Sequence, residues 1–268
     1  MQSQQSLRVL QAANIVAFVA TIVVNTLAST VGLNGSQTGA LSDALPNLFV
    51  PSGLTFSVWG VIYIFLLLFT VYQSWGLFSA RREAPLFVAK IGWLFFIASA
   101  ANIGWLLLWH WRQVGWSQLA MLALLACLIA IYLLLGTGRT AATPSERWFA
   151  RIPFSVYLGW ITVATIANAT ALLVKAGWGG FGVAPQVWTI AVIVAAVLIT
   201  LIVLATRRDA AYALVVAWAL AGIALKRSAD SSQASQAVGI TAMVAAAVVV
   251  VGIALAAVRS LLLARRTG

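Results

Sequence analysis

Residues 152–174 read IPFSVYLGWITVATIANATALLV, an apolar stretch without a single Asp, Glu, Lys or Arg. A helix of about 20 such residues crosses the hydrocarbon core of a bilayer. The chain has eight apolar stretches of similar length, at residues 8–28, 54–74, 87–109, 116–136, 152–174, 185–206, 210–225 and 237–258. This pattern predicts an all-α fold, a polytopic membrane helix bundle with about eight transmembrane helices.

The composition excludes most other classes of protein. Hydrophobic residues make up 63% of the 268 residues and charged residues only 8%, whereas soluble domains carry roughly 25% charged residues. A net charge of +11 would suggest nucleic-acid binding in a soluble protein, but here Lys and Arg lie almost entirely between the apolar stretches. That distribution is typical of membrane topology, so we expect membrane lipid as a partner and no nucleic acid.

The basic residues also predict the orientation of the chain. With eight spans both termini share a side, and that side holds most of the 16 Lys and Arg residues, among them Arg81, Arg82, Arg147, Arg207 and Arg208. Because positive residues stay cytoplasmic, we expect a multi-pass protein of the cell (plasma or inner) membrane with both termini cytoplasmic. The first apolar stretch is longer than a signal-peptide core, which predicts a retained helix.

Aromatic and amide side chains recur at helical spacing on several of the stretches. One face carries Phe56, Trp59 and Tyr63, a second Asn102, Trp105 and Trp109, a third Tyr157, Trp160, Ala164 and Asn168, and a fourth Asn14, Thr21 and Asn25. Amides in lipid need partners, so these faces should point into the bundle. If they converge they form a pocket for a flat, mostly apolar ligand. The alternative is plain helix packing, with Asn as an interhelical hydrogen-bonding residue.

The long connection at residues 29–53 contains no Lys or Arg. Loops of this length are usually functional or disordered. A lid over a cavity and a flexible connector are equal alternatives on composition alone.

Several kinds of chemistry find no support in the sequence. No Asp, Glu, Lys or Arg lies in the middle of a stretch, which argues against an ion-coupled pump and leaves an enzyme without an obvious acid or base. We predict no metal site and lean against an enzyme. The single histidine, His110, could ligate haem iron, but no second ligand is evident, so an interfacial aromatic-like residue is the favoured interpretation.

Three motifs, in order along the chain, resemble one known family. Residues 157–168, YLGWITVATIAN, resemble the last-helix pattern YLAWxxxATxLN of the translocator protein family (TspO/MBR, tryptophan-rich sensory proteins). Residues 102–105, NIGW, look like its NxxW helix, and residues 51–63 are similar to its PPGWxFxxxWxxxY segment. The resemblance covers residues 1–178.

The resemblance implies a five-helix ligand-binding bundle at 1–178, with an apolar cavity partly roofed by the loop between the first two helices. Residues 179–268 would then form a three-helix transmembrane extension. The family binds porphyrins and other tetrapyrroles, and in some members sterols, and is often dimeric. It thus implies a hydrophobic small-molecule ligand of the porphyrin or haem type, no required cofactor, and a homodimer.

Carried over by position, the resemblance places seven residues in or beside the cavity, Trp59, Tyr63, Asn102, Trp105, Tyr157, Trp160 and Asn168, and Phe56 shares a helix face with two of them. The chain departs from the pattern at Gly53 and Thr55, where the family has Trp and Phe. Ala169 and Leu173 replace the Tyr and Arg of the sterol motif, so sterol binding loses support. We expect a receptor or sensor; the alternatives are an uncoupled transporter of a hydrophobic molecule and a porphyrin-degrading enzyme.

Overall fold

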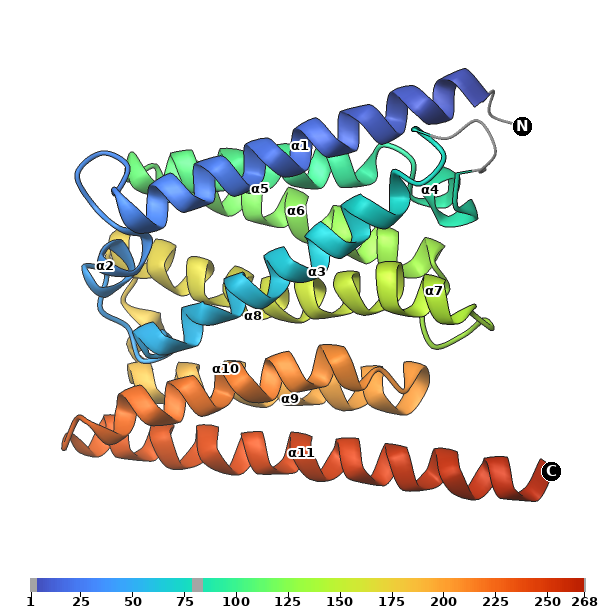
Figure 1. Ribbon diagram of the computed structural model, residues 1–268. Coiled ribbons are helices and arrows are strands. Elements are labelled where there is room, and N and C mark those ends of the chain that lie inside the picture. The colour runs from blue at the N-terminus through green and yellow to red at the C-terminus, as the bar shows by residue number, and fades with distance from the viewer. Residues whose placement is uncertain (1–3, 79–83, 268) are drawn as a thin grey trace.

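The computed structural model describes residues 4–78 and 84–267, and within them no strand occurs. The long helices run alternately up and down the bundle (Figure 1), as α1 Gln4–Thr30, α3 Val58–Gln73, α5 Leu94–His110, α6 Val114–Leu134, α8 Ile152–Lys175, α9 Pro185–Arg207, α10 Ala210–Ser228 and α11 Gln233–Thr267. Seven helical segments of the described chain are long and apolar enough to cross a membrane, and Leu94–His110 is a shorter apolar helix. The predicted all-α polytopic bundle is confirmed.

One predicted span is not a single helix. The stretch at 87–109 divides into α4, Leu86–Ile91, and α5, with the break at Gly92. Gly92 has φ 55° and ψ −138°, a backbone conformation that residues with a Cβ rarely adopt. The expectation of a continuous third helix from 87 was therefore wrong, because one glycine interrupts the hydrogen-bond ladder.

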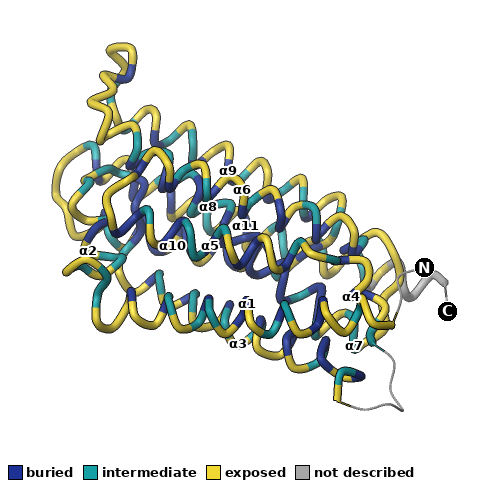
Figure 2. The backbone as a smooth tube through the Cα atoms, turned by 90° about the horizontal axis from the view of Figure 1, so that it is seen from above, coloured by how far each residue is buried: buried dark blue, intermediate teal, exposed yellow. Residues whose placement is uncertain are grey.

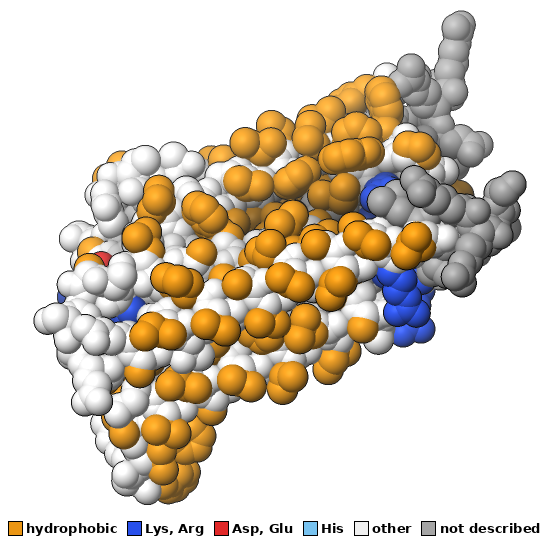
Figure 3. Space-filling model, turned by 90° about the horizontal axis from the view of Figure 1, so that it is seen from below, with side chains coloured by type: hydrophobic (Ala, Val, Ile, Leu, Met, Phe, Trp, Pro, Cys, Tyr) orange, Lys and Arg blue, Asp and Glu red, His pale blue; other side chains and the backbone are white. Residues whose placement is uncertain are grey.

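The outer surface of the bundle is apolar. Large side chains such as Val16, Ile64, Ile202 and Leu255 are well exposed, and hydrophobic atoms spread over the face drawn in Figure 3. Buried residues line the inner sides of the helices (Figure 2). A surface of this kind is stable against lipid tails and not in water, so the chain is an integral membrane protein.

Helix α8 lies at the centre of the fold, packed against α3, α6 and α10. Its Phe154 meets Phe69 of α3 edge to face, with ring centroids 4.9 Å apart, and Phe95 of α5 at 5.9 Å. Edge-to-face packing of this kind suits the charge distribution of aromatic rings. This trio joins three helices toward the end of the bundle that holds both termini, where α8 and α5 begin and α3 ends.

The last three helices share the core of the preceding ones. A Cβ on Gly159 of α8 would meet the backbone oxygen of Tyr212 in α10 at 2.8 Å, so only glycine permits this approach. Beside it, the Ser155 hydroxyl donates to Asp209 Oδ2 at 2.6 Å, and the Tyr212 hydroxyl lies 3.2 Å from Thr162 Oγ1. The division of the chain at residue 178 stays a prediction, but α8 and α10 pack as neighbours.

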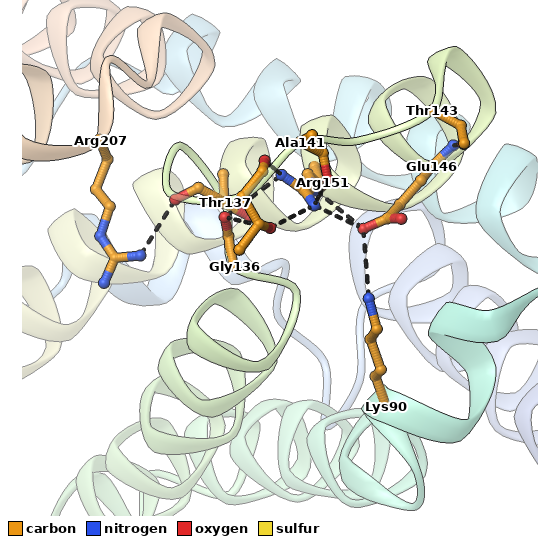
Figure 4. A network of polar contacts seen from close by, with 9 residues as sticks. Lys90, Gly136, Thr137, Ala141, Thr143, Glu146, Arg151 and Arg207 are labelled. Carbon is orange, nitrogen blue, oxygen red and sulfur yellow. Dashed lines mark hydrogen bonds and ion pairs between the residues drawn. The ribbon is translucent and has the colours of Figure 1, made fainter.

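The end of the bundle that holds both termini is fastened by a buried arginine (Figure 4). Arg151 donates to Glu146 Oε1 from Nη2 at 2.8 Å and from Nε at 3.0 Å. It also donates to the backbone oxygens of Gly136, Thr140 and Ala141. These contacts neutralise the charge and satisfy the carbonyls of the turn after α6, which sets where α8 begins.

We predict that Gly159→Leu separates α8 from α10. The added side chain cannot fit between the two backbones, and overpacking of this kind costs about 1–3 kcal/mol. The thermal unfolding temperature of the purified variant in detergent should fall by several degrees. Gly104→Ala, on α5 with no atom within 4 Å of the new Cβ, is the matched control and should behave as wild type. Equal stability of Gly159→Leu would contradict the close packing.

Candidate ligand site

Six aromatic side chains from α3, α5, α8 and the 3₁₀ turn η1, Gly53–Ser57, meet inside the bundle. Trp59 lies at their centre, with centroid distances of 5.6 Å to Tyr63 and 6.1 Å to each of Trp105, Tyr157 and Trp160. Phe56 meets Trp160 edge to face at 5.8 Å. We call this group the aromatic cluster: Phe56, Trp59, Tyr63, Trp105, Tyr157 and Trp160.

A chain of amides supports one side of the cluster. Asn25 of α1 donates to Asn102 Oδ1 at 2.9 Å, and Asn102 donates to the Tyr157 hydroxyl at 3.0 Å. Asn102 is fully buried. These bonds link α1, α5 and α8 and hold Tyr157 with its ring edge against Trp59.

A second amide fixes Trp105. Its indole N–H donates to Asn168 Oδ1 at 3.0 Å, while Asn168 Nδ2 donates to Gln118 Oε1 at 2.7 Å. The Ser117 hydroxyl also donates to Asn168 Oδ1, at 3.3 Å. The ring of Trp105 is thereby held in one orientation by groups on α6 and α8.

A small cavity of about 50 Å³ lies between the cluster and the loop above it. It is lined by Thr38, Ser42, Pro51, Phe56, Trp59, Trp105, Trp109, Trp160, Val163, Ala164, Ala167 and Asn168. Pockets for drug-sized ligands measure about 300–1,000 Å³. The structure thus contains an element of both interpretations of the aromatic faces, helix packing and a ligand pocket. Most of the rings pack on one another, and a small cavity remains at the edge of the cluster.

The indole N–H of Trp160 makes no hydrogen bond within the described part of the chain, although it is fully buried. Buried donors usually have a partner, and leaving one unpaired costs about 1–3 kcal/mol. Trp160 lines the cavity. The nitrogen has almost no accessible surface, so an acceptor atom of a bound molecule would reach it only after neighbouring side chains move.

The connection after α1 forms a cover over the cavity. We call residues 31–52 the lid; it contains the short helix α2, Thr38–Asp43. Asn34 Nδ2 donates to the His110 backbone oxygen at 3.1 Å, and the Trp109 indole N–H donates to the Thr38 oxygen at 3.5 Å. Of the two alternatives for this connection, the structure shows a packed lid.

His110 is part of that attachment. Its Nδ1 lies 2.8 Å from the Leu106 backbone oxygen, which only accepts, so Nδ1 carries the proton. A neutral ring then presents an acceptor at Nε2, where the Thr38 hydroxyl lies at 3.4 Å. Iron ligation by His110 would require this contact with the lid to break. The described residues contain no group of three or more His, Cys, Asp or Glu that could hold a metal ion.

The eight residues proposed from the sequence lie together. Phe56, Trp59, Trp105, Trp160 and Asn168 line the cavity. The remaining three do not line it: Tyr63 stacks on Trp59, Tyr157 meets Trp59 in a T-shaped contact, and Asn102 donates to the Tyr157 hydroxyl. Their role in binding a ligand stays a prediction. The sequence interpretation missed Thr38 and Ser42 of the lid and Gln118, whose only signal was a polar residue within an apolar stretch.

Comparison with known proteins supports the family resemblance. The model of the family described as TSPO-like protein matches residues 11–255, which includes α9 and α10 and most of α11. No curated protein and no solved structure matches the chain.

We predict that Asn102→Leu destabilises the bundle by about 1 kcal/mol, because it leaves Asn25 and the Tyr157 hydroxyl without their partner in a dry interior. A double-mutant cycle with Tyr157→Phe, followed by unfolding in detergent, measures the effect. The double variant should lose less than the sum of the two single variants. Strictly additive losses would show that the two side chains are not coupled.

Proposed function

This chain belongs to the TSPO-like protein family, and we propose that it binds a hydrophobic planar ligand of the porphyrin or other tetrapyrrole class at the aromatic cluster, as a receptor or sensor. The observation that carries the proposal is the unpaired Trp160 indole N–H beside a hollow walled by aromatic faces.

The cluster matches the chemistry of such a ligand. A flat conjugated ring system stacks on Trp and Tyr faces in the way that the rings of the cluster stack on one another. Trp59 contacts four other aromatic rings, so a ligand inserted beside it exchanges ring–ring contacts for ring–ligand contacts. An acceptor atom at the ligand edge then pairs with the Trp160 N–H, which supplies orientation.

Binding requires the lid to move, since a cavity of about 50 Å³ is too small for a tetrapyrrole. The lid is held on α5 by three hydrogen bonds at 3.1–3.5 Å and by Leu41 of α2, which is buried in an apolar cluster with Trp109. The longer of these hydrogen bonds are weak by the usual geometry. Displacement of α2 exposes the cavity from the loop end of the bundle, so we expect ligand entry from that end.

We further propose that the termini are cytoplasmic and that the lid faces the opposite side of the cell membrane. Both termini lie at one end of the bundle and α2 at the other (Figure 1). The termini end carries the greater number of basic residues, including Arg139, Arg147, Arg207 and Arg208, and such residues stay inside. Arg81 and Arg82, which contribute to the same prediction, lie outside the described residues.

Ligand binding is tested by titrating purified wild type and Trp160→Phe with protoporphyrin IX and following the porphyrin Soret band. The variant keeps an aromatic ring and loses the N–H donor. We expect saturable binding by wild type and about tenfold weaker affinity in Trp160→Phe, as for the loss of a hydrogen bond of about 1.4 kcal/mol.

The matched control is Trp148→Phe, an exposed tryptophan far from the cavity at the termini end, which should bind as wild type. Following the ligand spectrum avoids the change in protein fluorescence that any Trp substitution brings. Unsaturable binding by wild type, or equal affinity in all three proteins, would count against the proposed site.

Orientation is tested with single cysteines and a membrane-impermeant thiol reagent on intact cells. Ser231→Cys, in the turn between α10 and α11, should be labelled from outside, and Ala142→Cys, at the termini end, only after permeabilisation. Both positions are exposed, while the native Cys127 is buried and should stay unlabelled. The reverse pattern would place the termini outside.

A further inference from the structure

A second pocket, of about 840 Å³, opens at the loop end of the bundle between α8, α9, α10 and the lid. Its volume lies in the range of small-molecule sites. Ser42 of α2 lines both this pocket and the small cavity of the aromatic cluster, so the lid separates the two. Residues of α9 and α10 form part of its wall, and α10 packs against both α8 and α9.

One part of the second pocket is apolar and aromatic. Leu173 and Val174 at the end of α8 and Val192 of α9 line it. Trp178 and Trp188 lie beside them, with centroids 5.2 Å apart. The Trp188 indole N–H donates to the Gly180 oxygen at 3.0 Å, which fixes the loop between α8 and α9. This region suits an aliphatic chain or another apolar group.

The other part of the pocket contains Arg227, the penultimate residue of α10. The residue is only 9% exposed, and its Nε makes no hydrogen bond within the described residues. Its guanidinium donates once, from Nη1 to Ser235 Oγ at a long 3.4 Å. A guanidinium has five N–H donors, so Arg227 makes few hydrogen bonds for a buried cation.

The acidic residues of the pocket are already engaged. Asp43 of the lid pairs with Lys226 at 2.5 Å. Asp230 accepts from the Ser235 hydroxyl at 2.6 Å and from the Ser232 N–H at 2.9 Å. These hydrogen bonds, and to a smaller extent the positive charge of Arg227, lower the pKa of its carboxyl. Neither carboxylate closes an ion pair with Arg227 among the described residues. The buried guanidinium therefore retains donors for an anion.

We propose that the second pocket binds an amphiphile with an anionic headgroup, a carboxylate or a phosphate, whose head pairs with Arg227 and whose apolar tail lies against Trp178 and Trp188. A guanidinium binds either anion by paired hydrogen bonds. Such a molecule reaches the pocket as a membrane phospholipid or as a free fatty acid or alkyl phosphate. The site is separate from the aromatic cluster and does not depend on its ligand.

The test uses the full chain, purified and delipidated in an uncharged maltoside detergent. Laurate and dodecyl phosphate are titrated, with dodecanol and dodecylamine as neutral and cationic probes of the same tail, and binding is read as a shift in unfolding temperature. We expect the two anions to stabilise wild type and the other two probes to give no shift beyond that of detergent. Equal shifts from all four would overturn the proposal.

Two charge variants test the headgroup contact. Arg227→Gln should weaken binding of both anions about tenfold or more. The control is Lys175→Gln, which removes a positive charge at the same end of the bundle but outside the pocket lining; it should bind the anions as wild type does.

Asp43→Asn frees Lys226 at the pocket rim and should tighten binding of the anions severalfold. This variant keeps the test decisive if Arg227→Gln fails to fold. Unchanged or weaker binding by Asp43→Asn would contradict the proposal.

A brominated fatty acid tests where the tail lies. Bromine quenches the fluorescence of nearby indoles. The tryptophan fluorescence of wild type should therefore fall on binding, and the fall should be much smaller in the Trp178→Phe, Trp188→Phe double variant. Mass spectrometry of protein purified without delipidation distinguishes the sources. A phospholipid retained by wild type and lost from Arg227→Gln identifies the membrane as the source, and binding of added laurate without any retained lipid identifies the free amphiphile. Quenching that is the same in wild type and double variant would refute the position of the tail.

Discussion

Polar groups inside a bilayer must find partners within the protein, and this constraint organises the bundle. Asn102 joins α1 to α8 through Asn25 and Tyr157, and Asn168 joins α8 to α5 and α6 through Trp105 and Gln118. Each amide also orients an aromatic ring. Two of the four rings around Trp59, those of Tyr157 and Trp105, are therefore held by the same hydrogen bonds that hold the helices, whereas Tyr63 and Trp160 are held by ring packing alone.

Two departures from the family pattern lie where the first helices meet α10, one on α8 and one in the turn η1. At Gly159, where the pattern has Ala, α10 approaches α8 so closely that a Cβ would meet the Tyr212 oxygen at 2.8 Å. Thr55, where the pattern has Phe, presents its backbone oxygen to the Trp218 indole N–H of α10 at 3.0 Å, while Ser52 donates to the Gly222 oxygen. Smaller side chains at both positions make room for α10, which joins α9 and α11 to the core.

The lid lies between the small cavity of the aromatic cluster and the second pocket, which differ in their chemistry. On one side the small cavity has aromatic walls and an unpaired indole donor, and on the other the larger pocket has an apolar wall and a buried guanidinium. Ser42 contributes to both. Because α2 contributes to the walls of both, a displacement of α2 would change the shape of both.

The sequence by itself determined the fold class, because apolar stretches near 20 residues have few alternatives to membrane helices. It also determined which faces point inward, since amides and aromatics at spacings of three and four residues share one side of a helix. It did not reveal the break at Gly92, because a single glycine is tolerated in many helices and only the local backbone conformation decides. Cavity sizes, the attachment of the lid to His110 and the burial of Arg227 with its Nε unpaired depend on how the helices and loops pack, so only the tertiary structure decided them.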